Sequence, residues 1–247
     1  MKAMILAAGL GTRLGPLTSD RPKALVEVTG RTLLEITIAR LRQFGVTEII
    51  VNVHHFADKV IEYLRSKENF GIRIEVSRED TLLDTGGGLK KAAWFFEEDA
   101  SRDEPFILHN VDVISDIDLD QIAKCHRQQR ALATLALQQR ETSRYLLFNE
   151  QMQLGGRFLV KEQKTEIVRS RGRLQQLAFT GIHVISPRVL PMVAEEGVFS
   201  IIQTYLRLAG EGQSIIGYRT DGAYWRDLGK PENVAQAEKD FQNGMFS

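Results

Sequence analysis

The sequence predicts an α/β fold with a mainly parallel central sheet, and three observations lead to this prediction. Strand and helix patterns alternate from residue 3 to about residue 137 with short connections, which is typical of a parallel sheet covered by helices on both faces. Beyond that point, short strand patterns are separated by polar turns, which indicates an added region of antiparallel strands. The 247 residues, 43% of them hydrophobic, are enough for one large domain. We therefore expect a Rossmann-like, three-layer α/β/α fold.

In the first half, short apolar runs alternate with amphipathic helical patterns. The first strand is apolar, brief and ended by glycines, which favours a buried parallel strand. The helix that begins at Thr32 has apolar residues at helical spacing, and Gly45 is a natural stop. The expected strands are Met4–Ala8, Glu48–Val53, Ile72–Val76 and Pro105–Leu108, and the expected helices are Thr32–Phe44, Ala57–Ser66, Gly87–Glu97 and Leu119–Gln129.

In the second half, the strand patterns are short and come in succession. The expected strands are Tyr145–Phe148, Phe158–Val160, Glu166–Val168, Gln176–Ile185, Ile215–Tyr218 and Tyr224–Trp225, and the expected helices are Pro187–Glu195, Ser200–Ala209 and a last one that begins at Pro231. No linker, repeat or low-complexity segment divides the chain, so we expect one domain over residues 1–247.

Composition excludes several classes of function. Lysine and arginine number 32 together, as do aspartate and glutamate, so no global charge favours nucleic acid or a membrane surface as a partner. The single cysteine, Cys125, excludes an internal disulfide framework and a cysteine-rich metal site. The apolar run in Met1–Ala8 is too short for a signal peptide. No apolar stretch approaches the roughly 20 residues of a membrane span, so we expect a cytoplasmic protein.

A glycine-rich loop follows the first expected strand, with Gly9, Gly11 and Gly15 in a G-x-G-x-x-x-G pattern. Ligands of open α/β sheets bind at the carboxyl ends of the strands, where backbone N–H groups can point at an anion. A dinucleotide fold requires an acidic residue at the end of the second strand, but this chain has His54 and His55 there. A P-loop requires G-K-[ST], which does not follow these glycines. Neither nucleotide motif matches.

The same loop carries two cations. Arg13 lies two residues after Gly11, and Lys23 follows a turn that contains Pro16 and Pro22. Two cations after a glycine-rich loop suit a polyphosphate better than a ribose. The sequence therefore predicts a phosphate-binding loop.

The stretch LAAGLGTRLGPLTSDRPKALV resembles the signature G-x-G-T-R-x-x-P-L-T-x-x-x-P-K-x-L of the sugar-nucleotide pyrophosphorylases, a family of nucleotidyltransferases. The resemblance continues through DTGGG at residues 84–88, HNVD at 109–112, FTGIHVI at 179–185 and WRDLGKPE at 225–232, and so spans nearly the whole chain. The order of these segments and the length are most similar to the compact bacterial uridylyltransferases and guanylyltransferases of the family.

This resemblance implies a reaction and an organisation. A phosphate oxygen of a sugar 1-phosphate would attack the α-phosphorus of a nucleoside triphosphate, with UTP or GTP expected, and the products would be a nucleoside diphosphate sugar and pyrophosphate. The NTP-binding half would be residues 1–137, and the sugar-phosphate half with the C-terminal helix residues 138–247. Such an enzyme has small-molecule substrates and needs neither nucleic acid nor a membrane; a homodimer is compatible with it.

The resemblance also implies roles for individual residues. Lys23 would contact the α-phosphate and Arg13 the β- and γ-phosphates, since negative charge builds up there; with Asp112 they form the expected catalytic set. Nucleotide contacts are expected from Ala8, Gly9, Gly11, Thr12, Arg13, Lys23, Asp84, Thr85, Gly86 and Gly87, sugar contacts from Asn110, Thr180 and Gly181, and Mg²⁺ ligands from Asp112 and Asp227.

Two of these expectations concern the way in which a residue contacts its ligand. The glycines of residues 86–88 are interpreted as allowing the backbone to approach a flat base. The Thr180 hydroxyl is expected to donate a hydrogen bond to the sugar. Both interpretations depend on the local geometry of the folded chain.

The chain departs from the family pattern at two points. The Glu-Lys-Pro sequence that holds the sugar phosphate in many relatives is absent, which leaves Arg144, Arg169 and Arg171 as unranked alternatives. Val111 stands where the family usually has glycine before the metal-binding aspartate. Because a β-branched residue resists positive φ, either the backbone is ordinary there or the pocket beside Asp112 is smaller.

Two other functions stay open at this point. One is a cytidylyltransferase for a small phospho-alcohol such as phosphocholine, whose quaternary ammonium would need an aromatic face from Tyr145, Tyr224 or Trp225. The other is a catalytically inactive relative that binds a sugar nucleotide and regulates. The presence of all four charged residues of the expected site argues against the second.

Overall fold

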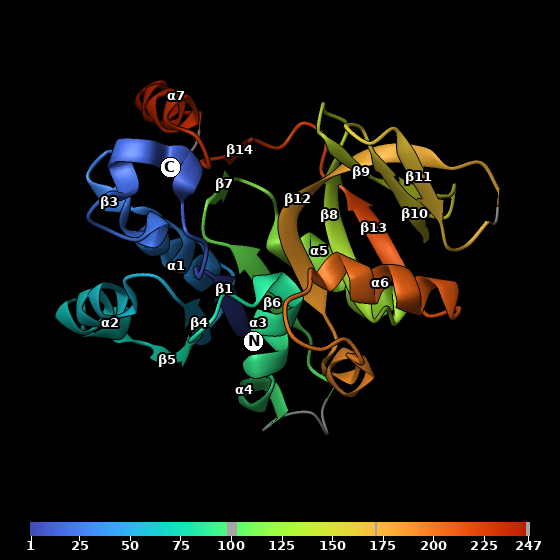
Figure 1. Ribbon diagram of the computed structural model, residues 1–247, viewed down its shortest axis with the longest axis horizontal. Coiled ribbons are helices and arrows are strands. Elements are labelled where there is room, and N and C mark those ends of the chain that lie inside the picture. The colour runs from blue at the N-terminus through green and yellow to red at the C-terminus, as the bar shows by residue number, and fades with distance from the viewer. Residues whose placement is uncertain (98–102, 171, 246–247) are drawn as a thin grey trace.

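The structure is a computed structural model that describes residues 1–97, 103–170 and 172–245. Its centre is a ten-stranded mixed sheet, which crosses the middle of the molecule in Figure 1. The parallel part contains β1 (Lys2–Leu6), β4 (Glu48–Val53), β5 (Arg73–Arg78) and β6 (Phe106–Asn110). Strand β1 lies between β4 and β6 and pairs with both in parallel, and β4 continues to β5. All four strands therefore end at the same edge of the sheet.

A mainly antiparallel part is attached to β6. It contains β8 (Ala133–Gln138), β9 (Arg144–Phe148), β10 (Leu154–Leu159), β11 (Lys164–Ile167), β12 (Gln175–Ile185) and β13 (Ile215–Arg219). Within it, β13 pairs with β8 in parallel. The long strand β12 joins the two parts, because it pairs antiparallel with β6, β8 and β9. The expected α/β fold, a mainly parallel centre with added antiparallel strands, is confirmed.

Helices cover both faces of the sheet. They are α1 (Leu33–Gln43), α2 (Ala57–Ser66), α3 (Asp84–Lys91), α4 (Trp94–Glu97), α5 (Leu119–Gln129), α6 (Ile201–Gly210) and α7 (Pro231–Gln242). Side chains of β1 alternate between two cores: Ile5 packs with residues of α1, α2 and α5, and Met4 with residues of α3, α4 and α6. This alternation produces the three layers that the sequence predicts.

Several element boundaries match the prediction closely. Strand β4 and helices α2 and α5 have the expected limits. Helix α1 begins one residue after Thr32, whose hydroxyl accepts a hydrogen bond from the Glu35 N–H at 3.1 Å as an N-cap. Strong periodicity together with a capping residue explains this agreement.

Other elements differ from the prediction. The helix expected over Gly87–Glu97 begins earlier, at Asp84, and is divided into α3 and α4. The helix expected over Pro187–Glu195 is a 3₁₀ turn that ends at Met192, and it contains Pro191, which cannot donate a backbone hydrogen bond. Two small sheets have strands too short to show a pattern: β2 (Glu27–Val28) with β3 (Arg31–Thr32), and β7 (Val113–Ser115) with β14 (Trp225–Asp227).

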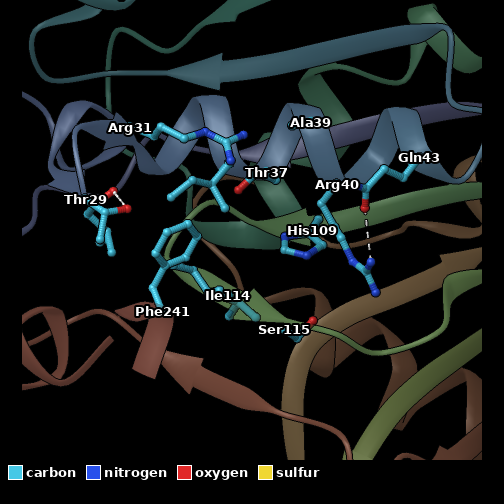
Figure 2. Close-up of a pocket in the computed structure, with 13 residues that line it drawn as sticks. Thr29, Arg31, Thr37, Ala39, Arg40, Gln43, His109, Ile114, Ser115 and Phe241 are labelled. Atoms are coloured by element: carbon cyan, nitrogen blue, oxygen red, sulfur yellow. Dashed lines mark hydrogen bonds between the residues drawn. The ribbon is translucent and has the colours of Figure 1, made fainter. Parts of the chain in front are cut away.

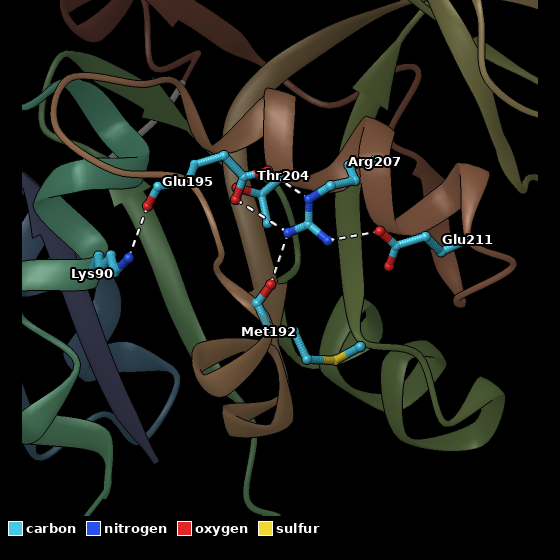
Figure 3. Close-up of polar contacts among 6 residues, drawn as sticks. All are labelled: Lys90, Met192, Glu195, Thr204, Arg207 and Glu211. Atoms are coloured by element: carbon cyan, nitrogen blue, oxygen red, sulfur yellow. Dashed lines mark hydrogen bonds and ion pairs between the residues drawn. The ribbon is translucent and has the colours of Figure 1, made fainter.

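A polar network holds the segment before α6 against both halves of the chain (Figure 3). The Arg207 guanidinium of α6 pairs with Glu195 at 2.8 Å and donates to the Met192 carbonyl at 2.8 Å. The Lys90 ammonium of α3 donates to the Glu195 carbonyl at 2.8 Å. Helices α3 and α6, which both border one large cavity, are thereby fixed relative to one another.

The C-terminal helix returns to the N-terminal loop. Helix α7 packs against the 3₁₀ turn Thr12–Thr18 and against β2, and Figure 1 shows α7 beside these first segments of the chain. Among the described residues no helix is long and apolar enough to cross a membrane.

Candidate functional site

Four charged side chains from distant parts of the sequence meet at the carboxyl ends of β1 and β6. We call Arg13, Lys23, Asp112 and Asp227 the charged cluster. The Lys23 ammonium is in direct contact with the Asp112 carboxylate, and both side chains are largely buried, with 11% and 17% of their surfaces exposed. Lys23 begins a short 3₁₀ turn, and Asp112 lies in the turn between β6 and β7. The expected proximity of Lys23 and Asp112 is therefore observed.

Pairing of β14 with β7 brings Asp227 next to Asp112. Asp227 is the register partner of Val113, and the Leu228 N–H donates to the Asp112 carbonyl at 2.7 Å. The Arg13 guanidinium lies beside Asp227, since both would clash with a Cβ atom at Gly229. Thus the backbone of Asp227 lies next to that of Asp112, and the Arg13 guanidinium lies beside the Asp227 carboxylate. Their roles as metal ligands and phosphate contacts stay predictions.

The glycine loop leaves room above β1. A Cβ atom at Gly9 would meet nothing within 4 Å, so no protein packing requires glycine there. Gly11 has a φ of 68°, and a Cβ atom would lie 2.9 Å from a Thr18 methyl group and 3.2 Å from the Lys23 Cβ. Glycine at residue 11 thus allows the loop to turn tightly against Lys23. Ala8 is buried and Thr12 begins the 3₁₀ turn.

The glycines of the DTGGG segment have a structural reason that the sequence did not show. They lie inside helix α3, and each packs against protein atoms. A Cβ atom at Gly86 would overlap the Phe199 ring, one at Gly87 would lie 2.5 Å from the Gly197 carbonyl, and one at Gly88 would lie 2.7 Å from the Asn52 amide. These contacts account for the three glycines without a base, and a role in base recognition stays a prediction.

Sequence reasoning missed a buried polar chain between the glycine loop and α3. The Asn52 side chain accepts from the Ala7 N–H at 2.8 Å and donates to Glu79 at 2.7 Å. The Glu79 carboxylate also accepts from the Leu83 N–H at 2.9 Å, and Asn52 and Glu79 are each 2% exposed. These hydrogen bonds fix the loop after β1 relative to the start of α3. The only signal in the sequence was a polar residue within the apolar β4.

A cavity of about 600 Å³ opens beside the charged cluster. The predicted residues that line it are Asp84, Thr85, Asn110, Thr180, Gly181 and Asp227. Asp84 has a φ of 59°, unusual for a residue with a side chain, and the Thr85 hydroxyl accepts from the Ile201 N–H of α6 at 3.0 Å. Gly181 has a φ of 85°, and a Cβ atom there would lie 2.8 Å from the Asn110 amide. The wall formed by β6 and β12 is therefore tightly packed.

The expected role of the Thr180 hydroxyl needs correction. This hydroxyl donates to the Ala136 carbonyl at 2.9 Å, and the side chain is 1% exposed. Its proton is thus used within the sheet, where β12 changes register against β8. Thr180 borders the cavity but does not offer it a free donor.

Val111 does not fill the space beside Asp112. The residue is 3% exposed, belongs to the core on the α1 side, and has no positive φ. Its N–H donates to the Leu6 carbonyl at 3.1 Å. Of the two interpretations, an ordinary backbone is correct. A valine fits here because its side chain points away from the cavity.

An arginine that the sequence did not single out lies beside Asp227. The Arg140 guanidinium stacks on the Trp225 ring at 3.6 Å and donates to the Phe179 carbonyl at 2.7 Å. The Trp225 indole N–H donates to the Thr180 carbonyl at 2.8 Å. Burial lowers the pKa of the Arg140 guanidinium, and the charge of Asp227 acts in the opposite direction. No spacing pattern could have indicated Arg140, because only tertiary packing brings it to Trp225.

The arginines named from the sequence occupy different places. Arg144 lines the large cavity, whereas Arg169 does not, and Arg171 lies outside the described residues. Arg157, also in the lining, pairs with Glu166 at 2.7 Å. Of the aromatic residues considered for a quaternary ammonium, Trp225 has one face covered by Arg140. The Tyr224 hydroxyl donates to Asp240 at 2.8 Å.

A small cavity of about 80 Å³ lies between α1 and β7 (Figure 2). His109 and Arg40 lie side by side in it, and burial lowers the pKa of His109 to about 4. The His109 Nδ1 is 2.8 Å from the Asn110 carbonyl oxygen. A neutral histidine and a volume of a few waters do not suit a nucleotide or a sugar.

The donor set of the charged cluster suits Mg²⁺. This ion binds proteins through one or two carboxylates together with substrate phosphates and waters. Asp112 and Asp227 are two such carboxylates: Asp112 directly precedes β7, and Asp227 is the last residue of β14, which pairs with β7. Among residues 1–97, 103–170 and 172–245, no group of three or more His, Cys, Asp or Glu side chains could hold a metal ion. The arrangement therefore fits an ion held jointly with phosphate oxygens.

Comparison with known proteins gives consistent results. The family described as Nucleotidyl transferase matches residues 2–244. The chain is 35% identical to N-acetylmuramate alpha-1-phosphate uridylyltransferase from Caulobacter vibrioides, over 96% of this chain and 95% of that protein. It is 32% identical to mannose-1-phosphate guanyltransferase from Yarrowia lipolytica, over 99% of this chain but only 63% of that longer protein.

Solved structures share the fold at low sequence identity. HddC from Yersinia pseudotuberculosis, in complex with GMP-PN, superposes with a TM-score of 0.75 at 22% identity, covering 97% of this chain and 99% of that one. UDP-glucose pyrophosphorylase in complex with UDP-glucose gives a TM-score of 0.79 at 15% identity, covering 98% of both chains.

Proposed function

The chain belongs to the nucleotidyl transferase family, and on that premise we propose that it transfers a nucleoside monophosphate from UTP or GTP to a sugar 1-phosphate. The products are a nucleoside diphosphate sugar and pyrophosphate. The uridylyltransferase and guanyltransferase relatives support these two bases. We place the reaction in the cytoplasm.

The observation that carries this proposal is the convergence of the charged cluster at the end of β1. An oxygen of the sugar phosphate attacks the α-phosphorus, and the bond from this phosphorus to the oxygen bridging the β-phosphate breaks. Two anions must meet, so positioning and cations contribute most to the rate. The direct contact of Lys23 with Asp112 and the place of Arg13 beside Asp227 supply cations and anions at one point.

The residues of the cluster then have distinct roles. Lys23 exchanges Asp112 for the α-phosphate, and Arg13 neutralises the pyrophosphate as it leaves. Asp112 and Asp227 would hold Mg²⁺, which when bound neutralises and orients the phosphate oxygens. In the free protein Lys23 and Asp112 compensate each other, so that neither charge is left buried alone.

The nucleotide and the sugar lie on opposite sides of the cluster. The backbone of Gly9 and Gly11 contacts the triphosphate, and Ala8 and Gly87 border the base. The open space above Gly9 supports this placement. Asn110 and Gly181 form the wall that the sugar contacts, which their position in the large cavity supports.

A substrate matrix tests the proposal. Pyrophosphate release is measured with Mg²⁺ for each of the four common NTPs against the 1-phosphates of N-acetylmuramate, mannose and glucose, and for CTP with phosphocholine. We expect one uridine or guanosine pair to dominate, and chelation of Mg²⁺ to stop it. Turnover only with CTP and phosphocholine, or binding without turnover in every pair, would contradict the proposal. We also propose a homodimer, which light scattering of the purified chain tests.

A further inference from the structure

Arg140 is held rigidly at the border of the large cavity. It follows β8, and its guanidinium is stacked on Trp225 at 3.6 Å and bonded to the Phe179 carbonyl at 2.7 Å. Trp225 is itself fixed by its hydrogen bond to the Thr180 carbonyl at 2.8 Å. An aromatic face and a carbonyl orient this cation, and a planar guanidinium suits both contacts.

The charge of Arg140 has no counter-ion in the free protein. Among the described residues no carboxylate forms an ion pair with it: its two terminal nitrogens donate to the Phe179 and Glu141 carbonyls, at 2.7 and 3.3 Å, and its Nε is buried without an acceptor. A desolvated cation without a counter-ion is unfavourable. An anionic ligand in the cavity would compensate this charge through the terminal nitrogens.

The location specifies which anion. Arg140 stacks on Trp225, two residues before Asp227 on the same strand, and both Arg140 and Asp227 line the cavity. The attacking phosphate must come next to the α-phosphate held by the charged cluster. At neutral pH a phosphate monoester carries about two negative charges. The phosphate of the sugar 1-phosphate therefore needs a cation on the cavity side of Asp227.

The other cations of the lining are less suited to this task. Arg157 is already compensated by Glu166 at 2.7 Å. Arg144 is exposed and lies at the start of β9, without a side-chain contact that would orient it among the described residues. Neither combines an uncompensated charge with a fixed position.

We propose that Arg140 binds the phosphate group of the sugar 1-phosphate, in place of the lysine of the absent Glu-Lys-Pro sequence. This inference rests on the proposed function. Each terminal nitrogen of Arg140 has a second N–H without an acceptor among the described residues, and Trp225 is the platform that positions the guanidinium at the cavity. Arg140 is thus a binding residue for the acceptor substrate, distinct from the cations that serve the triphosphate.

The test uses the β-phosphate of the product, because this group comes from the sugar phosphate. For the pair that the matrix identifies, calorimetry measures the affinity of the nucleoside diphosphate sugar and of the nucleoside monophosphate, which lacks that group. Arg140→Gln should weaken the sugar nucleotide about tenfold to a hundredfold and leave the monophosphate unchanged. In steady-state assays the KM for the sugar 1-phosphate should rise, and the KM for the NTP should stay the same.

Two further variants complete the test. Arg140→Lys keeps the charge but loses the planar stack, and we expect an intermediate loss. Arg144→Gln is the matched control in the same cavity, and we expect a smaller effect than for Arg140→Gln. Equal weakening of both ligands, or a larger loss in Arg144→Gln, would overturn the assignment. Failure of the proposed function would show earlier, as a wild-type protein without turnover.

Discussion

The two sides of the site treat charge differently. In the charged cluster, Lys23 is compensated by Asp112, and Arg13 lies beside Asp227. In the large cavity, Arg140 has an aromatic ring and two carbonyls as partners and no carboxylate among the described residues. The first arrangement must exchange partners when substrate and metal bind, whereas the second is already open to an anion.

This difference teaches where the binding energy of each substrate acts. Exchange of a partner costs part of the interaction energy, so under the proposed function we expect the triphosphate to need several contacts and a metal ion to displace Lys23 from Asp112. A fixed, uncompensated cation needs no such exchange. Removal of a group from the cluster should therefore reduce the rate most, and changes around the cavity should act mainly on the affinity for the sugar phosphate.

The largest effect is expected for Asp112→Asn. The neutral amide is a poor ligand for Mg²⁺ and leaves Lys23 without its partner, so turnover should fall by at least about 10³-fold. Circular dichroism checks that the variant is folded, because the substitution leaves the buried Lys23 ammonium without its counter-ion. Asp120→Asn, an exposed carboxylate in the first turn of α5, is the matched control and should keep its activity. Normal turnover in Asp112→Asn would contradict the assignment of Asp112 as a Mg²⁺ ligand.

The next largest effect is expected for Lys23→Gln. Loss of one charge-stabilising contact at the α-phosphate typically lowers kcat by about 10²- to 10³-fold. The KM for the sugar 1-phosphate should change little, because Lys23 belongs to the triphosphate side. Lys124→Gln, an exposed lysine of α5, serves as control. If the KM for the sugar 1-phosphate rose by as large a factor as kcat fell, Lys23 would not act on the triphosphate alone, and the proposed difference between cluster and cavity would be wrong.

A smaller effect is expected for Gly181→Ala on the cavity side. The positive φ strains any side chain, typically by about 1–3 kcal/mol, and the Cβ would lie 2.8 Å from the Asn110 amide. Stability should fall, and the KM for the sugar 1-phosphate should rise by about tenfold, the equivalent of about 1.4 kcal/mol. Gly212→Ala is a control with a φ of 89° and nothing within 4 Å of its Cβ. It should lose stability without a change in KM.

The smallest effect concerns pH, because the small and the large cavity are each lined by a buried histidine. Burial lowers the pKa of His109, in the small cavity, to about 4 and that of His183, in the large cavity, to about 3. In the unfolded chain the pKa is about 6.5, so below that pH the unfolded state takes up protons that the folded state does not. Stability is full above pH 6.5 and is lost as the pH falls.

Between pH 7 and pH 5, each of these histidines should lower the free energy of unfolding by about 2 kcal/mol. Chemical denaturation at both pH values measures the loss. His55→Gln, which changes an exposed histidine, should leave the difference unchanged. Equal stability at the two pH values would show that these histidines are not neutral in the folded protein.

The sequence predicted the cluster more completely than the cavity. Lys23 and Asp112 were found because a long motif and a buried strand mark them, and the structure places them in contact. The approach of Asp227 to Asp112 depends on β7 and β14, which have three residues each and show no periodicity. Only the family resemblance predicted that Asp227 approaches Asp112.

The other features that the sequence did not predict have one physical cause. Hydrogen-bond partners and packing neighbours are decided by tertiary contacts, so the sequence could not show that Thr180 donates to Ala136 or that Gly86 packs against Phe199. The same holds for the stack of Arg140 on Trp225. The fold class itself was predictable, because the alternation of strand and helix patterns is local.

The most direct test of the proposed transfer is the fate of the individual phosphates. The preferred NTP is labelled either at the α- or at the γ-phosphorus and is incubated with its sugar 1-phosphate and Mg²⁺. We predict that the α-label appears only in the nucleoside diphosphate sugar and the γ-label only in pyrophosphate. Release of the γ-label as inorganic phosphate, or an α-label that stays in a nucleotide without sugar, would contradict nucleotidyl transfer.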